Sequence, residues 1–132
     1  MNLLITLTTF ALMEGVTWLT HKYVMHGFLW YLHEDHHNKR EGTAIEKNDS
    51  FFIIFAIPSM LLIAAGTYAA GYDAALYVGI GIFLYGMAYF LVHDIFIHQR
   101  IKWFRNANNR YAKAVRRAHK MHHKHIGKED GE

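Results

Sequence analysis

The sequence predicts an all-α integral membrane protein: a helical bundle with three transmembrane helices and histidine-bearing helical segments at one membrane face. Three observations predict this fold, namely three long apolar runs, a one-sided distribution of Lys and Arg, and ten histidines arranged in two copies of one pattern. A chain of 132 residues has room for one domain, so we expect residues 1–132 to form a single membrane-embedded domain.

The apolar runs cover residues 3–19, 51–72 and 74–92, and the second and third carry no charged residue. Each approaches the ~20 residues that a helix needs to cross a bilayer about 30 Å thick. The first run could be a cleaved signal peptide, but no Lys or Arg precedes it and Glu14 interrupts it, so we favour a helix of the mature protein. The short polar break before Asp73 predicts a helical hairpin for the second and third runs.

The basic residues predict the orientation in the membrane. Four of the fourteen Lys and Arg lie between the first and second runs, ten lie in residues 100–128, and the hairpin tip has none. By the positive-inside rule, both histidine clusters are expected on the cytoplasmic side and the N-terminus on the opposite side. The basic C-terminal segment, with Trp103 and Phe104, predicts contact with anionic lipid headgroups rather than nucleic acid. An acidic electron carrier is a second candidate partner for this surface.

The histidine pattern is H-x4-H followed by H-x2-H-H. Its two copies consist of His21, His26, His33, His36 and His37, and then of His93, His98, His119, His122 and His123. Imidazole suits iron, zinc, copper and nickel, and a chain without cysteine has no thiolate ligand. One ion takes roughly four to six protein ligands, so ten imidazoles predict a dinuclear site in which each ion draws on both halves of the chain. His125 falls outside the repeat and is expected at the surface or in a supporting position.

The spacing of the histidines also predicts their local structure. At about 100° per residue, each H-x2-H-H triad lies within a roughly 100° sector of an α-helix. The two histidines of an x4 pair are separated by about 140° on an ideal α-helix, so each pair is expected where a helix ends, bends or carries a π-bulge.

Two acidic residues are candidates for supporting the ligands. Glu14 lies seven residues before His21 and shares its helix face, so it could accept a hydrogen bond from this imidazole or bond to another helix. Asp94, next to His93, could orient that imidazole or cap the emerging segment. Beyond the metal centre, the sequence identifies no catalytic residue.

The four histidine blocks resemble those of the membrane-bound fatty acid hydroxylase and sterol desaturase superfamily of di-iron oxygenases. Residues 25–27, 32–37, 46–49, 89–100 and 118–132 resemble, more narrowly, the bacterial β-carotene hydroxylases, also called carotenoid 3,3'-hydroxylases. The similarity covers nearly the whole chain, although relatives commonly continue beyond the segment that resembles residues 128–132.

The resemblance implies a non-haem di-iron monooxygenase of the bacterial inner membrane, with the ten histidines as iron ligands. Such an enzyme uses O2 and two electrons from a ferredoxin-type donor to hydroxylate C3 of β-ionone rings, taking β-carotene through β-cryptoxanthin to zeaxanthin. Zinc could replace iron in a nitrogen-rich site and leave it inactive. The alternatives are a related lipid hydroxylase or desaturase with the same metal site, and a non-enzymatic membrane metal-binding protein. A haem cytochrome would need only two to four axial histidines.

Overall fold

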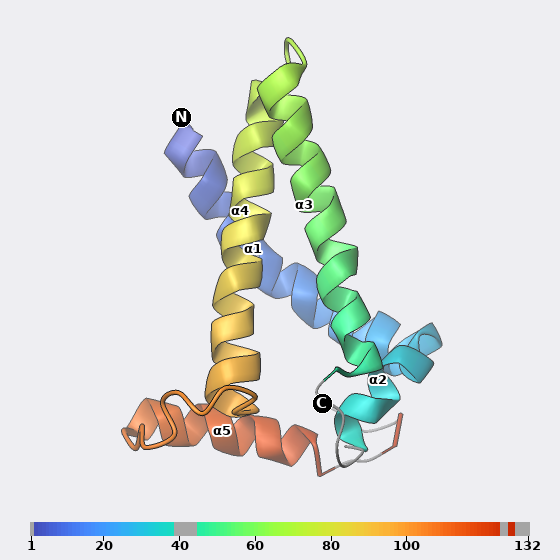
Figure 1. The fold of residues 1–132 in the computed structure, drawn as a ribbon, viewed down its shortest axis with the longest axis vertical. Helices are drawn as coiled ribbons and strands as arrows, with labels where there is room; N and C mark the ends of the chain where they lie inside the picture. The colour runs from blue at the N-terminus through green and yellow to red at the C-terminus, as the bar shows by residue number, and fades with distance from the viewer. Residues whose placement is uncertain (1, 39–44, 125–126, 129–132) are drawn as a thin grey trace. The chain divides into compact units, whose positions relative to one another are not determined.

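The computed structural model describes residues 2–38, 45–124 and 127–128, and these residues contain helices and no strand (Figure 1). This confirms the all-α prediction, whereas His125 lies outside the described residues. The α-helices are α1 (Asn2–Leu19), α2 (Trp30–His37), α3 (Ser50–Tyr68), α4 (Asp73–Phe90) and α5 (Arg110–His122), joined by the π-helices η1 (Thr20–Phe28) and η3 (Leu91–Ile97) and the 3₁₀ helix η2 (Lys47–Asp49).

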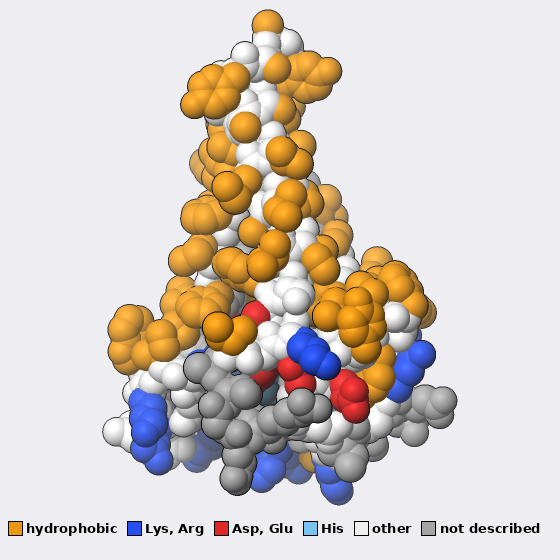
Figure 2. All heavy atoms as spheres, turned by 45° about the vertical axis from the view of Figure 1, so that its right-hand side comes forward, with side chains coloured by type: hydrophobic (Ala, Val, Ile, Leu, Met, Phe, Trp, Pro, Cys, Tyr) orange, Lys and Arg blue, Asp and Glu red, His pale blue; other side chains and the backbone are white. Residues whose placement is uncertain are grey.

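Three helical segments are long and apolar enough to cross a membrane, as the sequence predicts. They are Asn2–Phe28, Lys47–Tyr68 and Asp73–Ile97, with 27, 22 and 25 residues. Apolar side chains gather on the exposed faces of the long helices (Figure 2), for example Leu3 on α1, which is 70% exposed, and Leu61 on α3, which is 65% exposed. Lipid rather than water suits such a surface, so the chain is an integral membrane protein.

The chain divides into two compact units. The hairpin unit consists of Met1–Leu19 and Asp49–Ala88, and the histidine unit consists of Thr20–Asn48 and Tyr89–Glu132. In the hairpin unit, α3 and α4 are joined by a short turn in which Gly71 has φ +83°, a conformation that favours glycine. The expectation of one membrane-embedded domain stays a prediction.

Glycines set how closely the helices of the hairpin unit approach. A Cβ atom at Gly79 would lie 2.8 Å from the carbonyl oxygen of Ser59 on α3, and one at Gly81 would lie 2.8 Å from that of Thr6 on α1. Both positions therefore need the absence of a side chain, as expected for small residues between membrane helices. Gly86 differs, because its Cβ would meet nothing within 4 Å.

Polar side chains of the hairpin unit bond between helices. The Ser59 hydroxyl donates to the carbonyl of Gly79 at 2.8 Å, and the Tyr85 hydroxyl donates to Oε2 of Glu14, also at 2.8 Å. Such bonds satisfy groups that lipid cannot hydrogen-bond. The structure thus shows Glu14 in the second of its two expected roles, bonding to another helix, and its contribution to an imidazole stays a prediction.

Candidate metal centre

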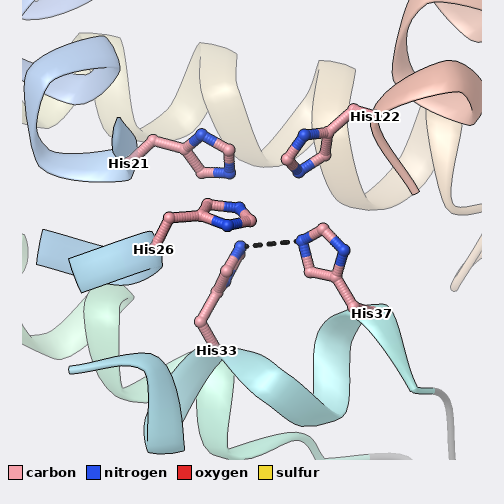
Figure 3. Close-up of side chains that lie close together, drawn as sticks. All are labelled: His21, His26, His33, His37 and His122. Carbon is pink, nitrogen blue, oxygen red and sulfur yellow. Dashed lines mark hydrogen bonds between the residues drawn. The ribbon is translucent and has the colours of Figure 1, made fainter. Parts of the chain in front are cut away.

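The histidine unit brings nine of the ten predicted ligands into two groups, in each of which the potential ligand nitrogens lie within 4.8 Å of one another. Group A consists of His21, His26, His33, His37 and His122, and group B consists of His36, His93, His98 and His119. The imidazoles of group A point toward one another from three helices, η1, α2 and α5 (Figure 3). Each group draws on both copies of the sequence pattern, because His122 joins four N-terminal histidines and His36 joins three C-terminal ones.

His123, the tenth histidine of the pattern, lies beside both groups. Its ring centroid is 4.7 Å from that of His37 in group A and 4.7 Å from that of His36 in group B. Its Nε2 atom is 2.8 Å from Nε2 of His119. The geometry therefore places His123 next to the other nine without assigning it to one group.

The two x4 pairs lie on π-helical turns, as their spacing predicts. The ring centroids of His21 and His26, both in η1, are 4.7 Å apart. At the end of η3 the backbone N–H of His98 donates to the carbonyl of His93 at 2.9 Å, and the two rings are 4.6 Å apart. A π-helix bonds residues five apart, so its wider turn brings these side chains to one side. Gly27 then interrupts the helical backbone at the end of η1.

Histidines of the same triad belong to different groups. On α2, His33 and His37 are one turn apart and their Nε2 atoms approach to 3.2 Å in group A, whereas His36 turns to group B. On α5, His119 belongs to group B and His122 to group A. His36 and His37 point about 100° apart around α2, and His119 and His122 point about 60° apart around α5, so each helix supplies imidazole nitrogens to both groups.

Two imidazoles of group B donate hydrogen bonds to carboxylates. Nδ1 of His36 is 2.9 Å from Oε2 of Glu46, and Nδ1 of His93 is 3.3 Å from Oδ2 of Asp94. A carboxylate oxygen only accepts, so Nδ1 carries the proton and Nε2 keeps the lone pair that can bind a metal. The structure thus places Asp94 in contact with His93, and its role in orienting a metal ligand stays a prediction.

Two imidazoles of group A donate to neutral oxygens. Nδ1 of His33 is 2.7 Å from Oδ1 of Asn48, and Nδ1 of His26 is 3.1 Å from the backbone carbonyl of Lys128. Sequence reasoning did not identify Asn48, nor Glu46 two residues before it, as site residues. The sequence feature that could have indicated them is the presence of two hydrogen-bond acceptors, Glu46 and Asn48, in the short segment before the second apolar run.

Burial keeps four imidazoles outside the membrane spans neutral. Desolvation is the largest cause that lowers the pKa of His33 and His123 to about 3 and the pKa of His119 to about 2. The same cause, with neighbouring imidazoles as the next, holds the pKa of His36 far below its ordinary value. Neutral imidazole is the form that binds metal ions, so these four side chains are ready to bind at neutral pH.

The arrangement fits transition-metal ions. The Nε2 atom of His36 is buried without a hydrogen-bond partner in the described part of the chain. The Nε2 atoms of His98 and His119 lie 2.7 Å apart. Two nitrogens bound to one ion at about 2.1 Å would lie roughly 3.0–3.4 Å apart, so small shifts would let such pairs share an ion. Nitrogen ligands alone suit iron or zinc better than magnesium or calcium.

Comparison with known proteins gives consistent similarities. The family model described as fatty acid hydroxylase matches residues 6–130. Proteins named β-carotene hydroxylase from Pseudescherichia vulneris and Pantoea ananas are each 41% identical over 128 residues, which cover 97% of this chain and 71% of the relative. Another from a Paracoccus strain is 33% identical over 123 residues, covering 92% of this chain and 74% of that protein. No solved structure is significantly similar to the chain.

Proposed function

Because the chain belongs to the fatty acid hydroxylase family, we propose that it is a membrane enzyme that hydroxylates the β-ionone rings of carotenoids at C3. β-Carotene is the proposed substrate, β-cryptoxanthin the intermediate and zeaxanthin the product, in line with the names of the relatives. The observation that carries the proposal is the pair of imidazole groups, each assembled from both halves of the chain.

The ten histidines of the pattern are the proposed ligands of two non-haem iron ions, one at group A and one at group B. Bound iron supplies the oxidising power that an unactivated C–H bond requires and that acid–base side chains lack. Hydroxylation of each ring consumes one O2, two electrons and two protons. It converts one C–H bond into a C–OH group and releases one water. A ferredoxin-type protein is the proposed electron donor.

The chain itself positions the ligands and admits the substrate. Glu46, Asp94 and Asn48 accept hydrogen bonds from the Nδ1–H groups of three imidazoles, and this leaves each Nε2 lone pair available for iron. The apolar helices place the enzyme in the membrane, where a lipid-soluble carotenoid dissolves. The positive-inside rule supports a cytoplasmic position for the histidines and the opposite side for the N-terminus.

Exposed cations support docking of an acidic electron donor near the helix that bears histidines of both groups. The α5 helix exposes Arg110, Lys113, Arg117 and Lys120 along the segment that also bears His119 and His122. A cluster of one charge steers an oppositely charged partner and speeds its encounter.

The test is pigment analysis of a β-carotene-producing bacterial host that expresses the chain. We expect zeaxanthin with the wild type and only β-carotene with a His36→Ala and His122→Ala double variant, which loses one imidazole from each group. Tyr72→Phe, an exposed change in the turn between α3 and α4, is the control and should keep the activity.

Metal analysis of the purified proteins separates the alternatives. Two iron ions per wild-type chain and fewer in the double variant support the metal centre. A well-expressed wild type that binds iron and makes no hydroxylated pigment would overturn the carotenoid substrate and direct the search to other membrane lipids. A chain that binds only zinc in the host would point to an inactive substituted site.

A further inference from the structure

Arg100 links two carboxylates that each hold an imidazole of group B. Its Nη2 atom is 3.1 Å from Oε2 of Glu46, and its Nε atom is 3.3 Å from Oδ1 of Asp94. Glu46 accepts a hydrogen bond from Nδ1–H of His36, and Asp94 accepts one from Nδ1–H of His93. The five side chains therefore form one continuous chain of contacts, from one imidazole to the other through a single guanidinium group.

The link joins segments that are far apart in the sequence. His36 lies on α2 and His93 on η3, and their rings stack at 5.0 Å with an interplanar angle of 26°. The Glu46 side chain is 9% exposed and the Asp94 side chain 15% exposed, so water screens them little. Two carboxylates close together repel each other, and a guanidinium group between them offsets this repulsion.

The guanidinium group also fixes geometry. It is planar and rigid, and it presents its N–H donors in a fixed fork. An ammonium group is a compact point charge on a flexible stem, so it cannot reproduce this spacing. Removal of Arg100 would therefore free both carboxylates to turn, and each could then turn its imidazole away from the other ligands of group B.

We propose that Arg100 is a positioning residue of group B, which holds Glu46 and Asp94 at a fixed separation and so orients His36 and His93 toward one metal ion. This inference rests on the metal-binding role proposed above. We expect the effect to be confined to group B, because His36 and His93 both belong to it, whereas Asn48 contacts His33 of group A.

The test uses the full-length chain, purified in detergent and loaded with ⁵⁷Fe, as the wild type, Arg100→Gln and Arg100→Lys. Mössbauer spectra resolve the two iron environments, and transfer to a chelator gives the release rate of each ion. Arg105→Gln, an exposed arginine of the same loop, is the matched control, and Asn48→Ala is the counterpart for group A.

We expect the Arg100→Gln protein to release one of the two ions at least about tenfold faster, since substitution of residues that support metal ligands typically lowers metal affinity by about 10–100-fold. Only the Mössbauer spectrum of that ion should change. The Arg100→Lys protein should release this ion more slowly than Arg100→Gln but faster than the wild type. The Arg105→Gln protein should have the release rates and spectra of the wild type. Asn48→Ala should affect the other ion. If Arg100→Gln fails to fold, Glu46→Gln and Asp94→Asn keep the shape of the site and should change the same single ion.

Equal effects of Arg100→Gln on both ions, or no effect on either, would overturn this inference alone. Selective loss of the same ion in Asn48→Ala and Arg100→Gln would also overturn it, because the two groups would then not be separate. A wild-type chain that binds no iron would instead overturn the proposed metal centre itself. The inference and the proposed function therefore fail in distinguishable ways.

Discussion

The Tyr85 hydroxyl on α4 donates a 2.8 Å hydrogen bond to Oε2 of Glu14 on α1. The Tyr85 ring is 9% exposed and meets the ring of Phe10 edge-on, with centroids 5.7 Å apart. A carboxylate within an apolar span is costly unless it has a partner, so this pair explains how α1 tolerates an acidic residue.

Replacement of Tyr85 by Phe keeps the ring packing and removes the donor. We expect the free energy of unfolding to fall by about 0.5–1.5 kcal/mol, the net contribution of a typical intramolecular hydrogen bond. Unfolding in mixed detergent micelles, followed by helicity, measures this change. In a Glu14→Gln background the same substitution should lower the free energy of unfolding by less. A Tyr85→Phe protein as stable as the wild type would show that the hydrogen bond contributes nothing.

Two glycines of α4 provide a matched pair of substitutions. A methyl group at Gly81 would meet the Thr6 carbonyl at 2.8 Å, so Gly81→Ala should separate α1 from α4 and lower the free energy of unfolding by about 1–3 kcal/mol. Gly86→Ala meets nothing within 4 Å and should leave stability unchanged or slightly raised, because alanine favours the helix. Thermal unfolding in detergent compares the two, and equal effects would contradict close packing at Gly81.

The lowered pKa values predict how acid affects the iron-free protein. The pKa of His33 and of His123 is about 3 in the folded chain, and unfolding returns both to about 6.5. Below about pH 6.5 the unfolded chain binds protons that the folded chain does not, so the free energy of unfolding should fall as the pH drops toward 3 and level off above about pH 7.

Chemical unfolding of the iron-free protein between pH 8 and pH 5 measures this dependence. A His33→Gln variant cannot take up its proton in either state, so its stability should vary less steeply with pH. Stability that rises on acidification would contradict the burial of neutral imidazoles.

Arg116 ties α5 to the loop before it. Its guanidinium group lies over the Phe96 ring, 4.4 Å from the centroid. It donates to three backbone carbonyls, those of Phe96, Phe104 and Ala107, the shortest bond being 2.9 Å to Phe104. Bonds from a charged donor contribute about 1.5–3 kcal/mol each, so Arg116→Gln should loosen the segment between η3 and α5.

Amide hydrogen exchange of residues 98–109 measures this loosening, and we expect at least a tenfold increase in rate. Arg117→Gln removes the same charge from the adjacent exposed position and should leave the exchange unchanged. Equal exchange in both variants would show that the Arg116 bonds do not hold the loop.

Local patterns in the sequence predict much of this protein. Apolar runs of sufficient length predict the three spans, and the number of histidines predicts two groups that each draw on both copies of the pattern. Which of His36 and His37 faces which group depends on how α2 meets η3 and α5, and spacing alone does not contain that information. The same holds for Glu14, whose partner Tyr85 is 71 residues away.

The partners of the imidazoles were the harder part to predict. Asp94 is adjacent to His93 and could be named from the sequence, whereas Glu46 is ten residues from His36 and reaches it only through the return of the chain. Arg100 is one of fourteen basic residues, most of them exposed, and only its two carboxylate contacts distinguish it from the others.

The π-helical turns at η1 and η3 have a consequence for reading unfamiliar sequences. Two histidines five residues apart lie on divergent faces of an α-helix, so an α-helical search template would reject them as partners. Such spacing at the end of an apolar span is better treated as a mark of one extra residue in the turn. Deletion of a single residue between His21 and His26 would then change the winding of the turn. Every later side chain of that segment would rotate about the helix axis, although the sequence that follows the deletion is unchanged.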